Sequence, residues 1–226
     1  MTGTVDQVAE RSAVEEFNSR AGAYDNWYRD NPVFVSELAA LQAIRAFLPR
    51  PALEIGVGPG HFAAALGTEF GLDPATTPLH LAAGRSIIAI NGAGEFLPLR
   101  SGSTGTVYIL FTLCFLADPA AVIRECFRIL APQGRLVLGF IPRCSPWGEN
   151  IIERGRRQHP LYRFARLQTV AEATRLLEEN GLVISEAWST LLQPPGRQAQ
   201  PENPLAGSRE DAGFCVLVSG RKGVEL

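Results

Sequence analysis

The sequence predicts an α/β fold in which helices cover both faces of a mostly parallel sheet. Three observations favour this doubly wound arrangement. Short, continuously apolar segments, which are typical of strands buried on both faces, alternate with amphipathic helical segments. The turns between these segments are short. The first apolar segment also runs directly into a glycine-rich turn and an alanine-rich helix, so we expect a Rossmann-like domain with its ligands at the carboxyl ends of the strands.

Seven strands follow from this pattern. They are expected at residues 52–55, 71–73, 86–90, 107–111, 135–141, 182–192 and 213–219. Helices are expected between them, at 34–48, 62–70, 118–134 and 169–181. Asp118 before Pro119 predicts an N-cap with proline in the first turn, and Gly134 should close that helix. Thr169 and Glu172 match a capping box at the start of the last helix.

Three segments do not fit the sheet pattern. Residues 7–31 are polar with interleaved aromatics, and residues 143–166 are rich in arginine and aromatics. We expect both to form helical lid elements over the sheet. Residues 193–211 are crowded with Pro, Gly, Gln and Ser and should form an extended or mobile loop. The chain, 1–226, is therefore interpreted as a single domain with two lids.

Composition excludes several function classes. A formal charge of −2 and 46% apolar residues disfavour a nucleic-acid binder. Lys222 is the only lysine, so Schiff-base chemistry, a phosphate-binding Walker lysine and a Tyr-x-x-x-Lys reductase pair have no suitable residue. The cysteines and histidines lie at irregular spacings, which predicts reduced thiols and no metal site. No apolar leader or long apolar run is visible, so a cytoplasmic protein without a membrane span is expected.

The glycine turn carries the strongest indication of a ligand. Glycine occupies alternate positions in Glu54-x-Gly56-x-Gly58-x-Gly60, which lets the backbone bend sharply and brings main-chain N–H groups close to a ligand. The dinucleotide fingerprint requires glycine at its sixth position, where His61 stands here. This spacing argues against NAD.

The string Glu-x-Gly-x-Gly-x-Gly resembles motif I of the class I S-adenosylmethionine (SAM)-dependent methyltransferases. Further matches follow in order: Asp73 at the end of the second strand, the segments 95–99 and 125–136, and the segment 214–219, which resembles the closing antiparallel strand of that family's sheet. The resemblance is strongest from Tyr24 to Phe140. It points to the type 11-like, small-molecule subgroup.

The resemblance implies SAM as cofactor and assigns parts of its site. Glu54 would face the methionine ammonium of SAM, Asp73 would bind the ribose hydroxyls, and Tyr24 would reach the SAM carboxylate. The other cofactor-binding residues expected are Gly56, Gly58, Pro59, Gly60, Pro74, Gly94, Glu95, Phe111 and Leu113. Each charged residue also has a structural interpretation: Glu54 could cap a backbone turn, and Asp73 could start one.

The acceptor side is less specified. Methyl transfer consists mainly of holding the acceptor in line with an already activated methyl group, so the sequence identifies no catalytic residue. Aromatic residues and one thiol are expected to line the acceptor site: Trp27, Cys114, Phe115, Trp147 and Tyr162. The arginines from 154 to 166 could attract an anionic acceptor or form a solvated helix face.

Three functions remain open at this point. The leading one is methyl transfer to a small molecule, with the acceptor atom (O, N or C) unresolved. The second is a methyltransferase-fold module that binds SAM or S-adenosylhomocysteine without turnover, because Ala93 and Gly105 replace acidic residues of the family pattern. The third, a nicotinamide-dependent reductase, is disfavoured by the glycine spacing. The oligomeric state does not follow from the sequence.

Overall fold

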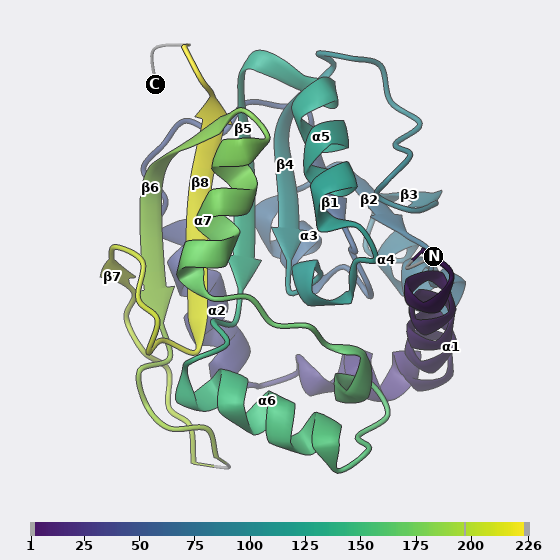
Figure 1. The fold of residues 1–226 in the computed structure, drawn as a ribbon, viewed down its shortest axis with the longest axis vertical. Helices are drawn as coiled ribbons and strands as arrows, with labels where there is room; N and C mark the ends of the chain where they lie inside the picture. The colour runs from purple at the N-terminus through teal and green to yellow at the C-terminus, as the bar shows by residue number, and fades with distance from the viewer. Residues whose placement is uncertain (1–2, 197, 224–226) are drawn as a thin grey trace.

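The computed structural model describes residues 3–196 and 198–223, with side chains from residue 13 onward, and consists of one mixed sheet flanked by helices (Figure 1). The strands are β1 (Ala52–Ile55), β2 (Phe70–Asp73), β3 (Ile88–Asn91), β4 (Thr104–Leu110), β5 (Leu130–Phe140), β6 (Leu182–Thr190), β7 (Leu205–Ala206) and β8 (Phe214–Arg221). The helices are α1 (Gly3–Trp27), α2 (Pro32–Gln42), α3 (His61–Leu66), α4 (Thr76–Ala83), α5 (Pro119–Ile129), α6 (Pro146–Arg156) and α7 (Val170–Glu179), with 3₁₀ turns η1 (Leu113–Phe115) and η2 (Tyr162–Phe164).

The strand order confirms the predicted fold class. It is β3-β2-β1-β4-β5-β8-β6-β7, with β1 to β5 mutually parallel. β8 is antiparallel and lies between β5 and β6, where Leu217 pairs with Leu138 on one side and with Ala187 on the other. The additional edge strand, β7, was not predicted. It is only two residues long and pairs with β6 through Trp188 and Ala206.

Each face of the sheet has its own core. On one face, α5 and α7 lie in front of the central strands (Figure 1). They bury apolar side chains such as Val122, Ile123 and Leu177 there. On the other face, α2 and α3 pack with residues such as Leu41 and Phe62. Every residue of β4 is buried, as expected for a strand covered on both sides. Each fully buried Leu or Ile contributes about 1.5–3 kcal/mol, so this double layer fixes the strand ends in place.

The predicted N-caps are confirmed. Asp118 accepts a hydrogen bond from the N–H of Ala121 at 2.9 Å, with Pro119 in the first turn of α5. Thr169 and Glu172 form the reciprocal capping box of α7. These side chains satisfy backbone N–H groups that have no partner within the helix.

Two helices end earlier than the sequence predicts. α2 ends at Gln42, because the following N–H groups of Arg45 and Ala46 donate to the carboxylate of Glu186, both at 2.8 Å, and not to helical carbonyls. α3 ends at Leu66, because Gly67 adopts a left-handed conformation (φ 66°) that terminates a helix. The chain then continues into β2, which begins at Phe70.

The prediction that Gly134 closes α5 was wrong. The helix ends at Ile129, and β5 begins at Leu130, so Gly134 lies within the strand. Pro132 has no N–H group and disfavours a helical conformation in the preceding residue, which explains the early change to extended backbone.

The described residues of the segment 193–211 form an extended connection that contains β7 and is attached to the body. The carboxylate of Glu202 accepts the N–H groups of Leu192 and Gln193 at 2.8 and 2.9 Å. The Glu202 N–H in turn donates to Ser36 of α2 at 2.8 Å. These contacts hold the loop beside α2.

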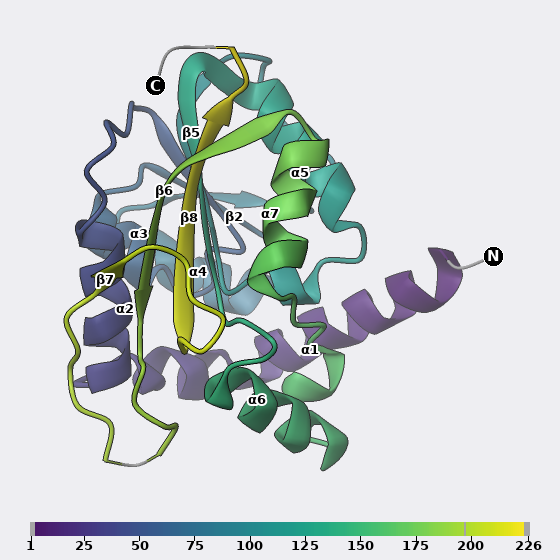
Figure 2. The same ribbon diagram turned by 60° about the vertical axis from the view of Figure 1, so that its left-hand side comes forward.

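The two lid segments lie beyond the carboxyl ends of the central strands. α1 and α6 occupy this end of the molecule in both views (Figures 1 and 2). The 3₁₀ turn η2 contacts α1, because Arg163 forms an ion pair with Glu16 at 3.1 Å. Within residues 3–196 and 198–223, no helix is long and apolar enough to cross a membrane.

Candidate functional site

A cavity of about 950 Å³ lies where the sequence predicts a ligand, at the carboxyl ends of β1, β2 and β4. The lids form its outer wall: α1 supplies Phe17 and Tyr24, while α6 and η2 supply Trp147 and Tyr162. Its floor includes Gly56 and residues of the β4–η1 turn. The size suits a nucleotide-sized ligand together with a small second molecule.

Different constraints favour glycine at the first two glycine positions of the turn, Gly56 and Gly58. Gly56 and Gly58 both have positive φ values, 71° and 51°. A Cβ on Gly56 would lie 2.1 Å from Oγ1 of Thr112, so packing requires glycine there. A Cβ on Gly58 would meet nothing closer than Tyr24, at 3.6 Å. Gly58 therefore presents its backbone to the cavity, as a ligand cradle requires.

Asp73 holds this turn and also lines the cavity. Oδ2 accepts the N–H of Gly58 and Oδ1 accepts the N–H of Ala75, each at 2.8 Å. Burial raises the pKa of this carboxyl, and the two N–H groups oppose that shift. A carboxylate has about four lone-pair positions, so two remain for hydroxyl donors of a ligand.

Glu54 lies outside the lining of the cavity. It is 2% exposed, and its Oε2 has no hydrogen-bond partner among the residues that the structure describes. Burial, and then the negative charge of Asp73, raise the pKa of the Glu54 carboxyl well above its ordinary value. Contact between this carboxyl and a cofactor ammonium stays a prediction.

Most of the predicted site residues meet at the cavity. Those that line it are Tyr24, Trp27, Gly56, Gly58, Asp73, Pro74, Gly94, Phe111, Leu113, Cys114, Phe115, Trp147 and Tyr162. Glu54, Pro59, Gly60 and Glu95 are not part of the lining. Gly60 instead faces α4 and the segment that follows it, because a Cβ on Gly60 would lie 2.6 Å from Ile87 and 2.9 Å from Ala82.

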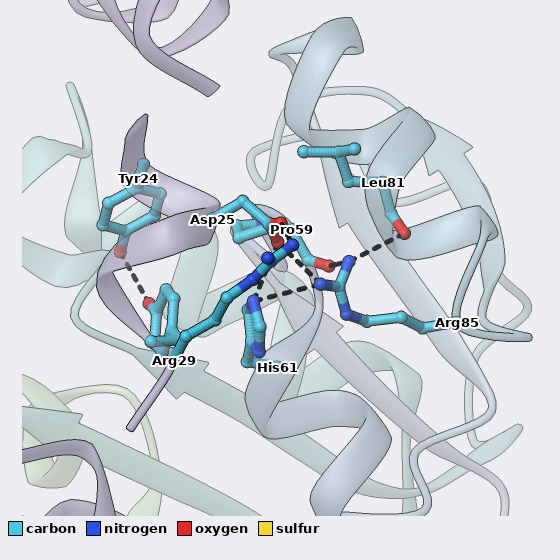
Figure 3. Close-up of polar contacts among 8 residues, drawn as sticks. Tyr24, Asp25, Arg29, Pro59, His61, Leu81 and Arg85 are labelled. Carbon is cyan, nitrogen blue, oxygen red and sulfur yellow. Dashed lines mark hydrogen bonds and ion pairs between the residues drawn. The ribbon is translucent and has the colours of Figure 1, made fainter. Parts of the chain in front are cut away.

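A polar cluster fastens α1 to the glycine turn (Figure 3). Asp25, 7% exposed, lies 2.8 Å from Nε2 of His61 and 2.6 Å from Nη2 of Arg85. Arg85 also donates to the carbonyl oxygen of Pro59 at 3.0 Å. Burial alone would raise the pKa of Asp25, but the His61 hydrogen bond and the charge of Arg85 hold it below its ordinary value. The ring of Tyr28 stacks on His61 at 4.3 Å.

The groups beneath α1 and η1 are mainly apolar. Phe17 packs edge-on against Phe115 with ring centroids 5.2 Å apart, which joins α1 to η1. Burial raises the pKa of the Cys114 thiol to about 12, so this group is a neutral thiol at neutral pH and a weak nucleophile. Within the described ranges, which omit residue 197 and the chain ends, no group of His, Cys, Asp or Glu side chains could hold a metal ion.

Many residues that line the cavity were not among the predicted site residues, and three of them carry polar groups used below: Tyr28, Glu37 and Arg154. Tyr28 donates to the hydroxyl of Tyr24 at 2.9 Å. The guanidinium of Arg154 lies 4.6 Å over the ring of Tyr162, so one arginine of the second lid faces the cavity. Glu37 could have been found in the sequence, because it lies four residues after Val33 and four before Leu41 on an otherwise apolar helical stripe.

Comparison with known proteins places the chain in a family. The model of the family described as a methyltransferase domain matches residues 53–138. An uncharacterized protein of Mycobacterium tuberculosis is 45% identical over 201 residues, which cover 87% of this chain and 70% of that protein. An uncharacterized protein of Methanocaldococcus jannaschii is 28% identical over 178 residues, which cover 78% of this chain and 85% of that protein.

Solved structures agree with this assignment. A SAM-dependent methyltransferase of Thermotoga maritima, described as a possible histamine N-methyltransferase, superposes with a TM-score of 0.84 at 28% identity, over 93% of this chain and 100% of that one. Geranyl diphosphate C-methyltransferase of Streptomyces coelicolor A3(2), solved with S-adenosylhomocysteine, shares the fold with a TM-score of 0.61 at 14% identity, over 84% of this chain and 79% of that one. The glycine turn, the sheet order with its antiparallel β8 and these matches lead to one conclusion: the chain belongs to the class I SAM-dependent methyltransferases.

Proposed function

We propose that this protein transfers a methyl group from SAM to a small-molecule acceptor. The observation that carries the proposal is the shape of one cavity, which joins the open backbone of Gly58 and the carboxyl of Asp73 to an aromatic space under the lids. A cofactor and an acceptor can therefore lie end to end in a space from which the lids exclude water.

The residues at the carboxyl ends of β1 and β2 fit the cofactor. The N–H groups of the glycine turn and the free lone pairs of Asp73 would receive the polar groups of SAM, and Gly94 would lie beside its adenine. When bound, SAM would supply an activated methyl group, and these residues would hold its sulfonium in line with the acceptor atom, which would take the methyl carbon as sulfur kept the electron pair.

The aromatic end of the cavity supports an apolar or aromatic acceptor. Trp27, Phe115, Trp147 and Tyr162 line this end and would orient such a molecule while shielding the methyl group from water. The Thermotoga maritima relative is described as a possible histamine N-methyltransferase, so nitrogen acceptors are the first class to test.

A binding module without turnover is the second candidate. Ala93 lines the cavity where many relatives carry an acid, and a methyl group offers no hydrogen bond to an adenine amino group. Mass spectrometry of the reaction mixture separates the two: acceptor molecules heavier by one methylene unit support transfer, and binding without such a product supports the module.

Calorimetry with S-adenosylhomocysteine tests the cofactor assignment. We expect a Kd in the micromolar range, corresponding to about −8 kcal/mol. Gly58→Leu should abolish binding in a folded protein, because its side chain would enter the cavity. The matched control is Gly102→Leu, at another positive-φ glycine with no neighbour within 4 Å of its Cβ, far from the cavity lining. Normal binding by folded Gly58→Leu, or binding of NADH alone by the unmodified protein, would contradict the assignment.

A further inference from the structure

Glu37 is a buried carboxyl in the wall of the cavity. It projects from the face of α2 that packs on the sheet, between Val33 and Leu41, and it is 4% exposed. The buried residues of that face are Val33, Ala40, Leu41 and the hydrogen-bonded Ser36, and the Glu37 side chain belongs to the cavity lining. A carboxyl in this position does not contribute to the apolar packing of the helix.

This carboxyl has no partner to compensate its burial. Oε2 has no hydrogen-bond donor within reach, and no cation pairs with the group in the part of the chain that the structure describes. Burial alone raises the pKa of Glu37 well above its ordinary value. Buried polar groups are nearly always satisfied, so one that faces a cavity without a partner indicates a donor that arrives with a ligand.

The surroundings of Glu37 suit a nitrogen base. The hydroxyl groups of Tyr24, Tyr28 and Tyr162 lie close enough for the negative charge of Glu37 to raise their pKa values. His61 stacks on the ring of Tyr28, and His159 stacks on the ring of Tyr162. The carboxylate would therefore stabilise a cationic or N–H-bearing group mainly through a charge-assisted hydrogen bond. Arg154 also lines the cavity, but its guanidinium lies over the ring of Tyr162.

The position of Glu37 favours the acceptor over the cofactor. The cofactor residues Gly58 and Asp73 lie at β1 and β2, whereas α2 packs against β6, β8 and α3. Tyr24 lies between the two carboxyls, since the charges of both Glu37 and Asp73 act on its hydroxyl.

We propose that Glu37 binds the nitrogen of the methyl acceptor, and that this acceptor is a small molecule with an amine on an aromatic body. The inference rests on the proposed methyl transfer. A cationic or N–H-bearing ligand beside Glu37 opposes the effect of burial on its pKa and so favours the ionised carboxylate. The amine in its neutral form donates an N–H to this carboxylate, which leaves the nitrogen lone pair free for the methyl carbon. When nitrogen gains the methyl group, the proton it loses passes to the Glu37 carboxylate, so the acceptor leaves as an uncharged amine.

Binding measurements on the protein saturated with S-adenosylhomocysteine test this. The probes are 2-phenylethylamine and tryptamine, each paired with the alcohol that carries hydroxyl in place of the amine. We expect the unmodified protein to bind at least one amine about tenfold or more tighter than its alcohol. Glu37→Gln should remove that preference and leave alcohol binding within about twofold, while Glu179→Gln, an exposed carboxyl on α7, should keep it.

Each contrary result has a distinct meaning. If neither amine binds better than its alcohol, or if Glu37→Gln keeps the preference, the acceptor assignment of Glu37 is wrong while the cofactor assignment stands. If Glu37→Gln weakens S-adenosylhomocysteine itself tenfold without any amine present, Glu37 serves the cofactor's ammonium and the proposal is overturned. If the unmodified protein does not bind S-adenosylhomocysteine, the proposed function fails first. A cooperative thermal unfolding transition of Glu37→Gln, at a temperature close to that of the unmodified protein, would show that the loss of binding does not come from a loss of folding.

Discussion

Asp73 and Glu37 are both buried carboxyls in one cavity, and they differ in how the protein supports them. Asp73 accepts two backbone N–H groups, which fix its orientation toward the turn. Glu37 has no such support, and its burial costs stability that only a ligand would offset. Unsupported polar groups of this kind are typical of sites where function takes precedence over stability.

The pKa of Glu37 predicts how stability depends on pH. Because its folded-state value is raised above the ordinary 4.5, the folded protein holds this proton after the unfolded chain has lost it. Stability from this group is therefore present below about pH 4.5 and is lost as the pH rises toward the folded-state value, with a slope of at most about 1.4 kcal/mol per pH unit. Glu37→Gln removes the dependence.

Urea unfolding at about pH 5, 6.5 and 8 measures it. As the pH rises, we expect the difference between the free energies of unfolding of Glu37→Gln and of the unmodified protein to change in favour of the variant. Glu54 has the same direction of shift and is present in both proteins, so its effect cancels in the difference. Parallel curves for the two proteins would show that the Glu37 carboxyl is solvated.

Asp73→Ala should weaken S-adenosylhomocysteine by about 1–3 kcal/mol, the range for losing hydrogen bonds to a charged group. Part of the loss comes from the ribose and part from the turn, since Asp73 also positions the N–H of Gly58. Calorimetry with an analogue that lacks both ribose hydroxyls separates the parts: its loss should be smaller. Equal losses for both compounds would mean that Asp73 acts through the turn alone.

At the scale of elements, the fastening of α1 decides whether the first lid can open. Asp25 connects this helix to His61 at the start of α3 and to Arg85 after α4 (Figure 3). Asp25→Ala leaves those groups without their carboxylate partner, so we expect a loss of about 1–3 kcal/mol in the free energy of unfolding or in lid closure. Faster hydrogen exchange over 13–28 would report it.

Glu15→Ala is the matched control for this change, because Glu15 lies on the same helix and is exposed. It should leave the exchange rates of α1 within experimental error of the unmodified protein. If Asp25→Ala and Glu15→Ala behave alike, packing of Tyr28 and its neighbours holds α1 and the polar cluster does not.

The sequence predicts the helix ends that are determined by residues within one turn of the end. Asp118 with Pro119, and Thr169 with Glu172, mark helix starts through contacts within one turn, and both are confirmed. The end of α2 depends on Glu186, which is distant in the sequence, so no local pattern could predict it. The two-residue β7 is too short for any periodicity to be detected.

The same distinction applies to the candidate site. Glycines next to a strand and aromatics in the lids can be read from the chain, and most of these residues line the cavity. Glu37 is not distinguished by a site motif, because the apolar residues around it predict a helix that faces the core. The position of Glu54 behind the turn depends on which face of β1 each side chain takes, and the motif alone does not determine that.

For the molecule as a whole, we predict that the two lid segments become ordered over the cavity when a ligand binds. Arg163 of η2 pairs with Glu16 of α1, and Phe17 packs on Phe115, so the two lids and the β4–η1 turn close the cavity together. We expect residues 7–31 and 143–166 to exchange amide hydrogens more slowly when S-adenosylhomocysteine is bound. Strong new protection around Tyr24 and Trp27 supports closure over the cofactor.

Protection confined to residues 54–115 would have a different meaning. It would show that the aromatics of α1 are ordinary packing residues that stay in place with or without ligand, and it would favour the module that binds without turnover.

The place of β8 in the sheet has a consequence for biosynthesis. This strand lies between β5 and β6, and its first residue, Phe214, stacks on Phe111 beneath the cavity at 4.7 Å. A ribosome makes β5 and β6 well before β8, so in the nascent chain both strands have an open edge where the finished sheet is continuous. Closure of the sheet must wait for residues 214–221, so the last strand to be made joins the parallel part of the sheet to β6.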